Sequence, residues 1–127
     1  MTRLVERSAL ALLLTVSAAT AQDVPSGQPL TLQEVLVEDL GEDTWVRFRF
    51  VAPDLTREAD YDAMADDMIH LCDTMALPYL TEYALQGDVI VISFAQKETE
   101  FGVADPDTVQ IFEAFRAPEG ACIWEGF

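Results

Sequence analysis

Residues 44–52 read TWVRFRFVA, and this stretch decides the fold. Every second side chain is apolar, and a period of two predicts a β-strand with two unlike faces. One face is expected to pack on the core and the other to point away from it. The core-facing series is Val46, Phe48 and Phe50, and the opposite series is Trp45, Arg47 and Arg49.

Two further segments extend the predicted sheet. Leu30–Glu38 forms the first arm of a hairpin with Thr44–Ala52, because the turn residues Leu40–Asp43 separate them. Val89–Phe94 reads VIVISF, a continuously apolar run that predicts a central strand covered on both faces.

A helix is expected between these strands. Thr56 is the predicted N-cap, and the helix should run to about Met75, where Pro78 interrupts it. Tyr79–Leu85 then adds a short helical turn. At 100° per residue the apolar side chains of the long helix fall on one buried face. This face comprises Tyr61, Met64, Ala65, Met68, Ile69, Leu71, Cys72 and Met75.

The C-terminal third gives a less regular pattern. Glu100–Val103 is a candidate edge strand. Thr108–Arg116 fits a helix or a strand, and a strand is favoured because the turn Pro118–Gly120 precedes a possible partner arm, Ala121–Trp124. We therefore predict an α+β fold: an antiparallel sheet of four to five strands with one main helix packed on a face.

The N-terminus predicts an export signal. Arg3 and Arg7 precede the apolar run Ser8–Val16, and Ala19 and Ala21 fit an A-x-A cleavage site. The alternative is an amphipathic or buried N-terminal helix. The expected organisation is a signal peptide over residues 1–21, a flexible leader over 22–29 and one α+β domain over 30–127. No other apolar stretch is long enough to span a membrane, so a periplasmic or secreted protein is expected.

Charge excludes one class of partner. The chain of 127 residues has 23 acidic and 7 basic residues, a formal net charge of -16. This field repels phosphate groups, so we expect no nucleic-acid partner. The acidic residues either form a solvated coat, which we favour, or attract cations or a basic partner.

Cys72 and Cys122 are the two cysteines. An even number of cysteines in an exported protein predicts a disulfide, and only one pairing is possible here. A redox-active role is disfavoured because there is no C-x-x-C motif and neither cysteine adjoins a lysine or histidine.

The face with Trp45, Arg47 and Arg49 is the candidate ligand or partner patch. An aromatic ring beside guanidinium groups can hold an anionic or sugar-like ligand or form the centre of a protein contact. The favoured alternative is that the arginines pair with Glu34 and Glu38 on the neighbouring arm.

The helix carries a candidate metal stripe. Asp62, Asp66, His70 and Asp73 project to one side, and oxygen with imidazole ligands can hold a divalent cation. The alternative, which we favour, is an acidic solvent face with an incidental histidine. The sequence predicts no catalytic residue: the serines lie outside G-x-S-x-G, and no glycine cluster forms a phosphate cradle.

Several segments resemble a family of short bacterial exported proteins of unknown function. They are VPSGQPLTLQEVLVED, TWVRFRFVAPDL, the HLC of the helix, VIVISF and the ending ACIWEGF with its CIWEGF motif, and the run from Phe112 to Phe127 is the most specific. The resemblance implies a secretory signal, one compact domain and a cysteine pair, and it brings no activity.

The functional hypothesis is a non-enzymatic binding or interaction module that needs no cofactor, with a small ligand or an envelope protein as partner. The alternative is a metal-dependent or hydrolytic enzyme that uses His70 with Asp66 and Asp73. A third possibility is a subunit of an envelope assembly.

Overall fold

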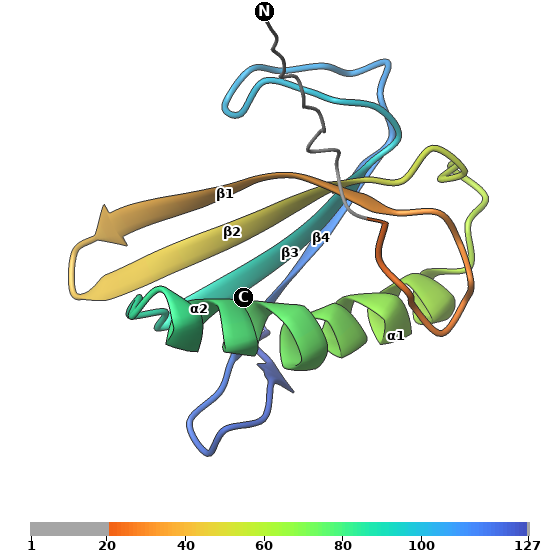
Figure 1. The fold of residues 1–127 in the computed structure, drawn as a ribbon. Coiled ribbons are helices and arrows are strands. Elements are labelled where there is room, and N and C mark those ends of the chain that lie inside the picture. Colours follow the sequence, from red (N-terminus) through yellow and green to blue (C-terminus); the bar gives the residue numbers. More distant parts are fainter. Residues whose placement is uncertain (1–20, 127) are drawn as a thin grey trace, which may run out of the picture.

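A computed structural model describes residues 21–126 and shows a five-stranded sheet with a helical layer on one face (Figure 1). The sheet order follows the chain, from β1 to β5. The strands are β1 Thr31–Leu40, β2 Asp43–Val51, β3 Val89–Ala95, β4 Gln110–Arg116 and β5 Ile123–Trp124. The helical layer consists of α1 Tyr61–Leu71, a π-helical segment Cys72–Ala76 and α2 Leu77–Glu82.

The predicted fold class is confirmed, with one exception in the strand directions. β1 and β2 form the expected antiparallel hairpin, and β4 is antiparallel to both β3 and β5. β2 and β3 instead run parallel, with Phe48 opposite Ile92. The helical layer connects these two strands, and such a crossover returns the chain to the starting end of the sheet.

The helix begins later and continues further than its sequence predicts. Asp60 is the N-cap in place of Thr56, and its carboxylate accepts hydrogen bonds from the backbone N–H groups of Asp62 and Ala63. Pro78 does not interrupt the helix. It lies in the first turn of α2, directly after the π-helical segment, where the backbone N–H of Leu77 bonds to the carbonyl of Cys72. The proline, which has no N–H to donate, is accommodated where the backbone pairing changes.

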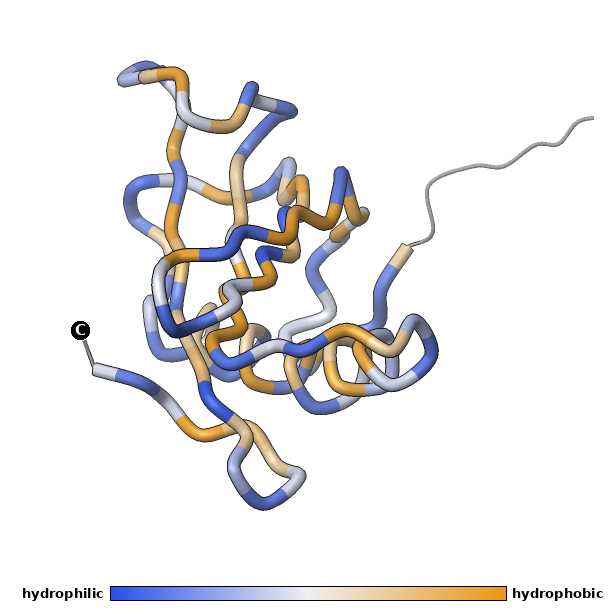
Figure 2. The backbone as a smooth tube through the Cα atoms, turned by 90° about the vertical axis from the view of Figure 1, so that its left-hand side faces the viewer, coloured by the Kyte–Doolittle hydropathy of each residue, from blue (hydrophilic) through white to orange (hydrophobic). Residues whose placement is uncertain are grey.

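The core lies between the sheet and the helical layer. The side chains of Val46, Phe48 and Phe50 are fully buried there, as their alternation predicts. Phe48 meets Tyr79 of α2 edge to face, with ring centroids 5.4 Å apart. Figure 2 shows hydrophobic residues along the central strands and at intervals along the helix. Among the described residues, no helix covers the opposite face of the sheet, here called the outer face.

The C-terminal third contains two confirmed strands and one corrected segment. The favoured strand over Thr108–Arg116 is β4, and its partner arm contains β5. Glu100–Val103 is not an edge strand: it forms a turn within residues 96–109, the β3–β4 loop, which rises on the side of the sheet opposite the helix (Figure 1). Side-chain contacts with β2, described below, hold it there.

Two long-range links fix the ends of the domain. The disulfide Cys72–Cys122 joins the start of the π-helical segment to the segment before β5. Residues 21–29 lie beside α1, where Ser26 and Gln28 bind the buried carboxylate of Asp67.

The predicted signal peptide falls almost wholly on residues 1–20, outside the described residues. Within residues 21–126, no helix has both the length and the apolar character that crossing a bilayer requires.

Candidate functional site

The outer face of the sheet carries the patch that the sequence singles out. Trp45, Arg47 and Arg49 share this face, as the period of two predicts, because their alternate neighbours fill the core. On β3 the residues opposite them are Val89, Val91 and Ser93, and on β4 Ala114 and Phe112 continue the same rows. The outer face is therefore aromatic and apolar around two guanidinium groups.

Arg49 anchors the β3–β4 loop. Its side chain is buried, and its Nη1 pairs with the carboxylate of Glu34 on β1. Its Nη2 donates to the backbone carbonyl and the hydroxyl of Thr99, at 3.1 and 2.9 Å. The Nε2 of Gln33 donates to the same carbonyl at 2.9 Å. These bonds connect the loop to β1 and β2, so Arg49 has a structural role.

Arg47 is more exposed than Arg49 and lies among aromatic rings. Its Nε donates to Glu38 of β1 at 2.6 Å, so both expected cross-strand pairs are present. Its guanidinium carbon is 5.3 Å from the ring centroid of Trp45 and 5.1 Å from that of Phe101 in the loop. Rings at this distance attract a cation through their quadrupole, so they hold the guanidinium in place.

A cleft of about 240 Å³ lies between the outer face and the β3–β4 loop. Its lining combines the two arginines with apolar and small polar side chains: Arg47, Arg49, Val91, Ser93, Glu100, Phe101, Gly102, Val103, Gln110 and Phe112. Three apolar residues at its rim are strongly exposed: Phe112 by 63%, Val103 by 54% and Phe101 by 43%. Exposed aromatic side chains that converge on a hollow are typical of a contact site.

Arg47 gives this cleft its polarity. Its bond to Glu38 uses Nε, and within residues 21–126 neither Nη1 nor Nη2 has a hydrogen-bond partner. Guanidinium N–H groups donate to carboxylates and other oxygen acceptors in a fixed planar geometry. The cleft can therefore accept a group that joins an apolar body to an oxygen acceptor.

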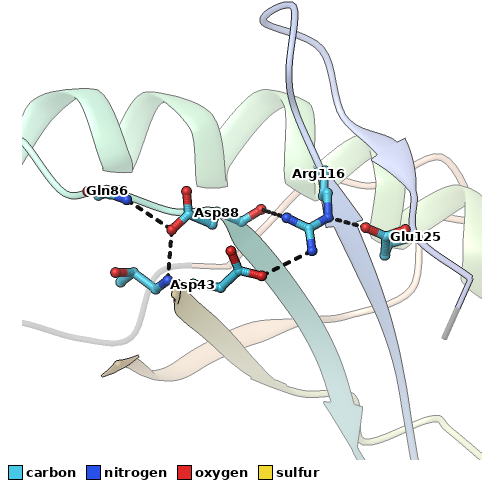
Figure 3. Close-up of polar contacts among 6 residues, drawn as sticks. Asp43, Gln86, Asp88, Arg116 and Glu125 are labelled. Atoms are coloured by element: carbon cyan, nitrogen blue, oxygen red, sulfur yellow. Dashed lines mark hydrogen bonds and ion pairs between the residues drawn. The ribbon is translucent and has the colours of Figure 1, made fainter. Parts of the chain in front are cut away.

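A second polar cluster closes the opposite end of the sheet (Figure 3). Arg116 of β4 donates to the carboxylates of Glu125 and Asp43 and to the backbone carbonyl of Asp88. Hydrogen bonds to Glu125 and then to Asp43 raise the pKa of Arg116. Every donor nitrogen of this guanidinium is engaged, so the cluster joins strand ends and offers no free cation.

Asp88 belongs to the same cluster. Its carboxylate accepts the backbone N–H of Thr44 at 2.8 Å and the amide of Gln86 at 2.9 Å (Figure 3). The bond from Thr44 and then that from Gln86 hold the pKa of Asp88 below its ordinary value; desolvation opposes them, and the charge of Arg116 adds a smaller lowering effect.

The predicted metal stripe does not converge on a metal site. Asp62 and Asp66 are exposed on α1, and the carboxylate of Asp73 accepts the backbone N–H of Cys122 at 2.8 Å. Across the described part of the chain, no three histidine, cysteine or carboxylate side chains are close enough together to hold a metal ion. Within the described residues, the three aspartates of the stripe therefore do not form a metal-ligand set with His70.

Of the residues that line the cleft, the sequence singles out Arg47 and Arg49 but not the aromatic and apolar residues at its rim. Phe112 was detectable, because the period of two on β4 puts it on the same face as Ala114. Phe101 and Val103 gave no such signal, since they belong to a loop whose position depends on contacts with Arg49, 50 positions away in the sequence.

Comparison with known proteins places the chain in one family. The model of a family of unknown function (DUF6497) matches residues 9–127, so the chain belongs to this family. No curated protein and no solved structure matches the chain.

Proposed function

We propose that this member of the DUF6497 family is an exported, non-enzymatic binding module whose ligand site is the outer-face cleft. The observation that carries the proposal is the free edge of the Arg47 guanidinium at a cleft with an apolar rim. The ligand is a flat apolar group with a carboxylate or another oxygen acceptor. Such a group would stack beside Phe101 or Phe112 while its oxygens accept from Arg47.

The surroundings of Arg47 support a binding role. Glu38 neutralises part of its charge but engages Nε alone, so the Nη edge keeps its donors. The rings of Trp45 and Phe101 orient the guanidinium before any ligand arrives, which lowers the entropic cost of binding. The chain's acidic excess disfavours polyanions, so a ligand with one acceptor group fits better than a polyphosphate.

Three small probes of one shape test the chemistry of the cleft. Phenylacetate, phenylacetamide and 2-phenylethylamine share a phenyl ring and differ in the charge of the attached group. Calorimetric titration of the purified protein should rank phenylacetate first and 2-phenylethylamine last. Equal affinities for all three probes would contradict the proposed role of Arg47.

A matched pair of variants tests whether the preference for phenylacetate depends on Arg47. Arg47→Gln should weaken phenylacetate binding by roughly tenfold, the value of one charged hydrogen bond, and weaken phenylacetamide binding less, because its neutral carbonyl accepts a weaker bond. Arg57→Gln removes the same charge from a residue outside the cleft lining, whose Nη2 donates to the carbonyl of Pro106. An equal loss in both variants would mean that long-range charge alone controls binding.

Export is the second part of the proposal. The predicted signal sequence over residues 1–21 supports it, as does the disulfide Cys72–Cys122, since disulfides persist in oxidising compartments. N-terminal sequencing of the protein recovered from outside the cytoplasm should begin at Gln22. An uncleaved N-terminus, or two free thiols in that material, would contradict this compartment.

A further inference from the structure

We propose that the free edge of β4 binds an extended, cationic peptide segment of another protein as an added strand. The edge shares Gln110 and Phe112 with the lining of the outer-face cleft but offers their outward backbone groups, and the proposal goes beyond the function proposed above. Among the described residues, part of the backbone along this edge is unpaired, and two clefts flank it. Its carboxylates favour a cationic peptide.

The unpaired backbone follows from the pairing of β4. One edge of β4 pairs with β3 from Gln110 to Phe115. The other edge meets β5 only at Phe115 and Arg116, with one more bond from the N–H of Glu125 to the carbonyl of Ala114. Backbone groups alternate between the two edges, so Gln110 and Phe112 point the same way as Ala114. No residue of the range 21–126 pairs with these two.

The other edge of the sheet is protected in a way that β4 is not. β1 carries Glu34, Glu38 and Asp39, has a bulge between Leu32 and Glu34, and is bridged at Thr31 by Ala21. Charges and bulges of this kind discourage strand addition. β4 has a regular register along its whole pairing with β3, and Phe112 is 63% exposed on it.

Two clefts run along the helical side of the free edge. The first, of about 360 Å³, lies between Leu55, Tyr61 and Ile111. The second, of about 190 Å³, lies between Ile69, Phe115 and Trp124. Ile111 and Phe115 are four residues apart, and alternate side chains of a strand point to one face. Residues i and i+4 of an added strand would therefore lie over the two clefts.

A carboxylate of the second cleft, which lies between Ile111 and Phe115 along β4, selects a basic side chain. Glu113 accepts hydrogen bonds from the hydroxyl of Tyr61 and from the Nε1 of Trp124, and Asp66 lines the second cleft beside it. Residue i+2 of an added strand would face Glu113, so lysine or arginine fits there. Two basic residues lie near this edge: Arg57 at the first cleft bonds to Pro106, and Arg116 of β4 is paired with Glu125 and Asp43.

Charge also decides between a partner protein and a second copy. Two copies would each bring a net charge of -16 and the same carboxylates to the contact, and this repulsion opposes self-pairing. A segment with apolar residues at i and i+4 and a basic residue at i+2 has complementary charge. Adding a strand in this way is an established mode of peptide recognition.

The test uses a capped seven-residue peptide of threonine, valine, threonine, lysine, threonine, valine and threonine in that order. Calorimetry should show binding, and hydrogen exchange at the amide of Phe112 should slow when the peptide is added. A peptide with glutamate in place of lysine should bind at least tenfold more weakly. Equal binding of the two peptides, or unchanged exchange at Phe112, would overturn the proposal.

Two variants at Gln110 isolate the backbone contribution. Gln110→Ala and Gln110→Pro both remove the side chain, but only proline removes the outward N–H. The alanine variant should keep its peptide affinity within about twofold, and the proline variant should lose roughly tenfold, with melting temperature as the check on folding. Equal affinities, or a dimer of the unliganded protein in ultracentrifugation, would overturn the proposal. Arg47→Gln should leave peptide binding unchanged, which separates this edge from the cleft.

Discussion

Ser26 binds the buried carboxylate of Asp67 through both its backbone N–H and its hydroxyl, at 2.9 and 2.5 Å. The amide of Gln28 adds a third bond to the same carboxylate, at 2.7 Å. A buried carboxylate is stable only when its oxygens are hydrogen-bonded, so the segment before β1 and the helix α1 depend on each other.

We expect Asp67→Ala to lower the free energy of unfolding by about 3 kcal/mol, since it removes three hydrogen bonds to a charged group. Asp66→Ala is the matched control: it deletes the adjacent carboxylate, which is exposed, and should change stability by less than about 0.5 kcal/mol. Urea unfolding followed by tryptophan fluorescence measures both. Similar values for the two variants would refute the structural role of Asp67.

The two outer-face arginines should differ in their contribution to stability. Arg49→Ala removes a buried cation with bonds to Glu34 and Thr99, and it should cost about 2–3 kcal/mol. Arg47→Ala removes a more exposed cation and should cost about 1 kcal/mol, mostly its contacts with the aromatic rings. Thermal unfolding measures both variants. A larger loss of stability in Arg47→Ala than in Arg49→Ala would contradict the structural role of Arg49.

Asp88 should contribute to the loss of stability in acid. Its pKa is lowered in the folded protein, so its contribution is present above the ordinary carboxyl value and is lost as the pH falls through the folded pKa. Asp88→Asn should therefore be less stable than the parent protein at neutral pH, and the difference should shrink below about pH 4. Melting temperatures from pH 7 to pH 2 test this, and a constant or growing difference would contradict the lowered pKa.

The disulfide should supply a large part of the net stability. The cysteines are 50 positions apart, and closing a loop of that size in the unfolded chain is worth about 4 kcal/mol. Replacing both with alanine should reduce the urea midpoint strongly, and dithiothreitol should have the same effect on the parent protein but none on the variant. A reductant effect on the variant would show that the loss has another source.

The sequence predicts those parts of the fold that depend on local pattern. The alternation of Val46, Phe48 and Phe50 identifies β2 and its two faces, and the apolar run beginning at Val89 identifies a central strand. Neither pattern predicts whether β3 runs parallel or antiparallel to β2, since both directions require the same apolar residues. The length of the helical connection is the only sequence feature that bears on it.

The candidate site shows the same limit. Arg47 and Arg49 are found by their spacing, and their pairing with Glu38 and Glu34 follows from the hairpin. Phe101 completes the cleft from a loop that has no periodic pattern. Its position results from hydrogen bonds between Arg49 and Thr99, and tertiary contacts of this kind cannot be predicted from composition or spacing.

Nuclear magnetic resonance with phenylacetate tests the central claim most directly, because the two tryptophans report on different surfaces. Trp45 contacts Arg47, which lines the cleft, and Trp124 lies at the C-terminal end beside Glu113. We predict saturable shifts of the Trp45 indole N–H and of the amides of Ser93 and Gly102, with the Trp124 indole unmoved. Shifts confined to Trp124, or none at any of these groups, would contradict a ligand site on the outer face.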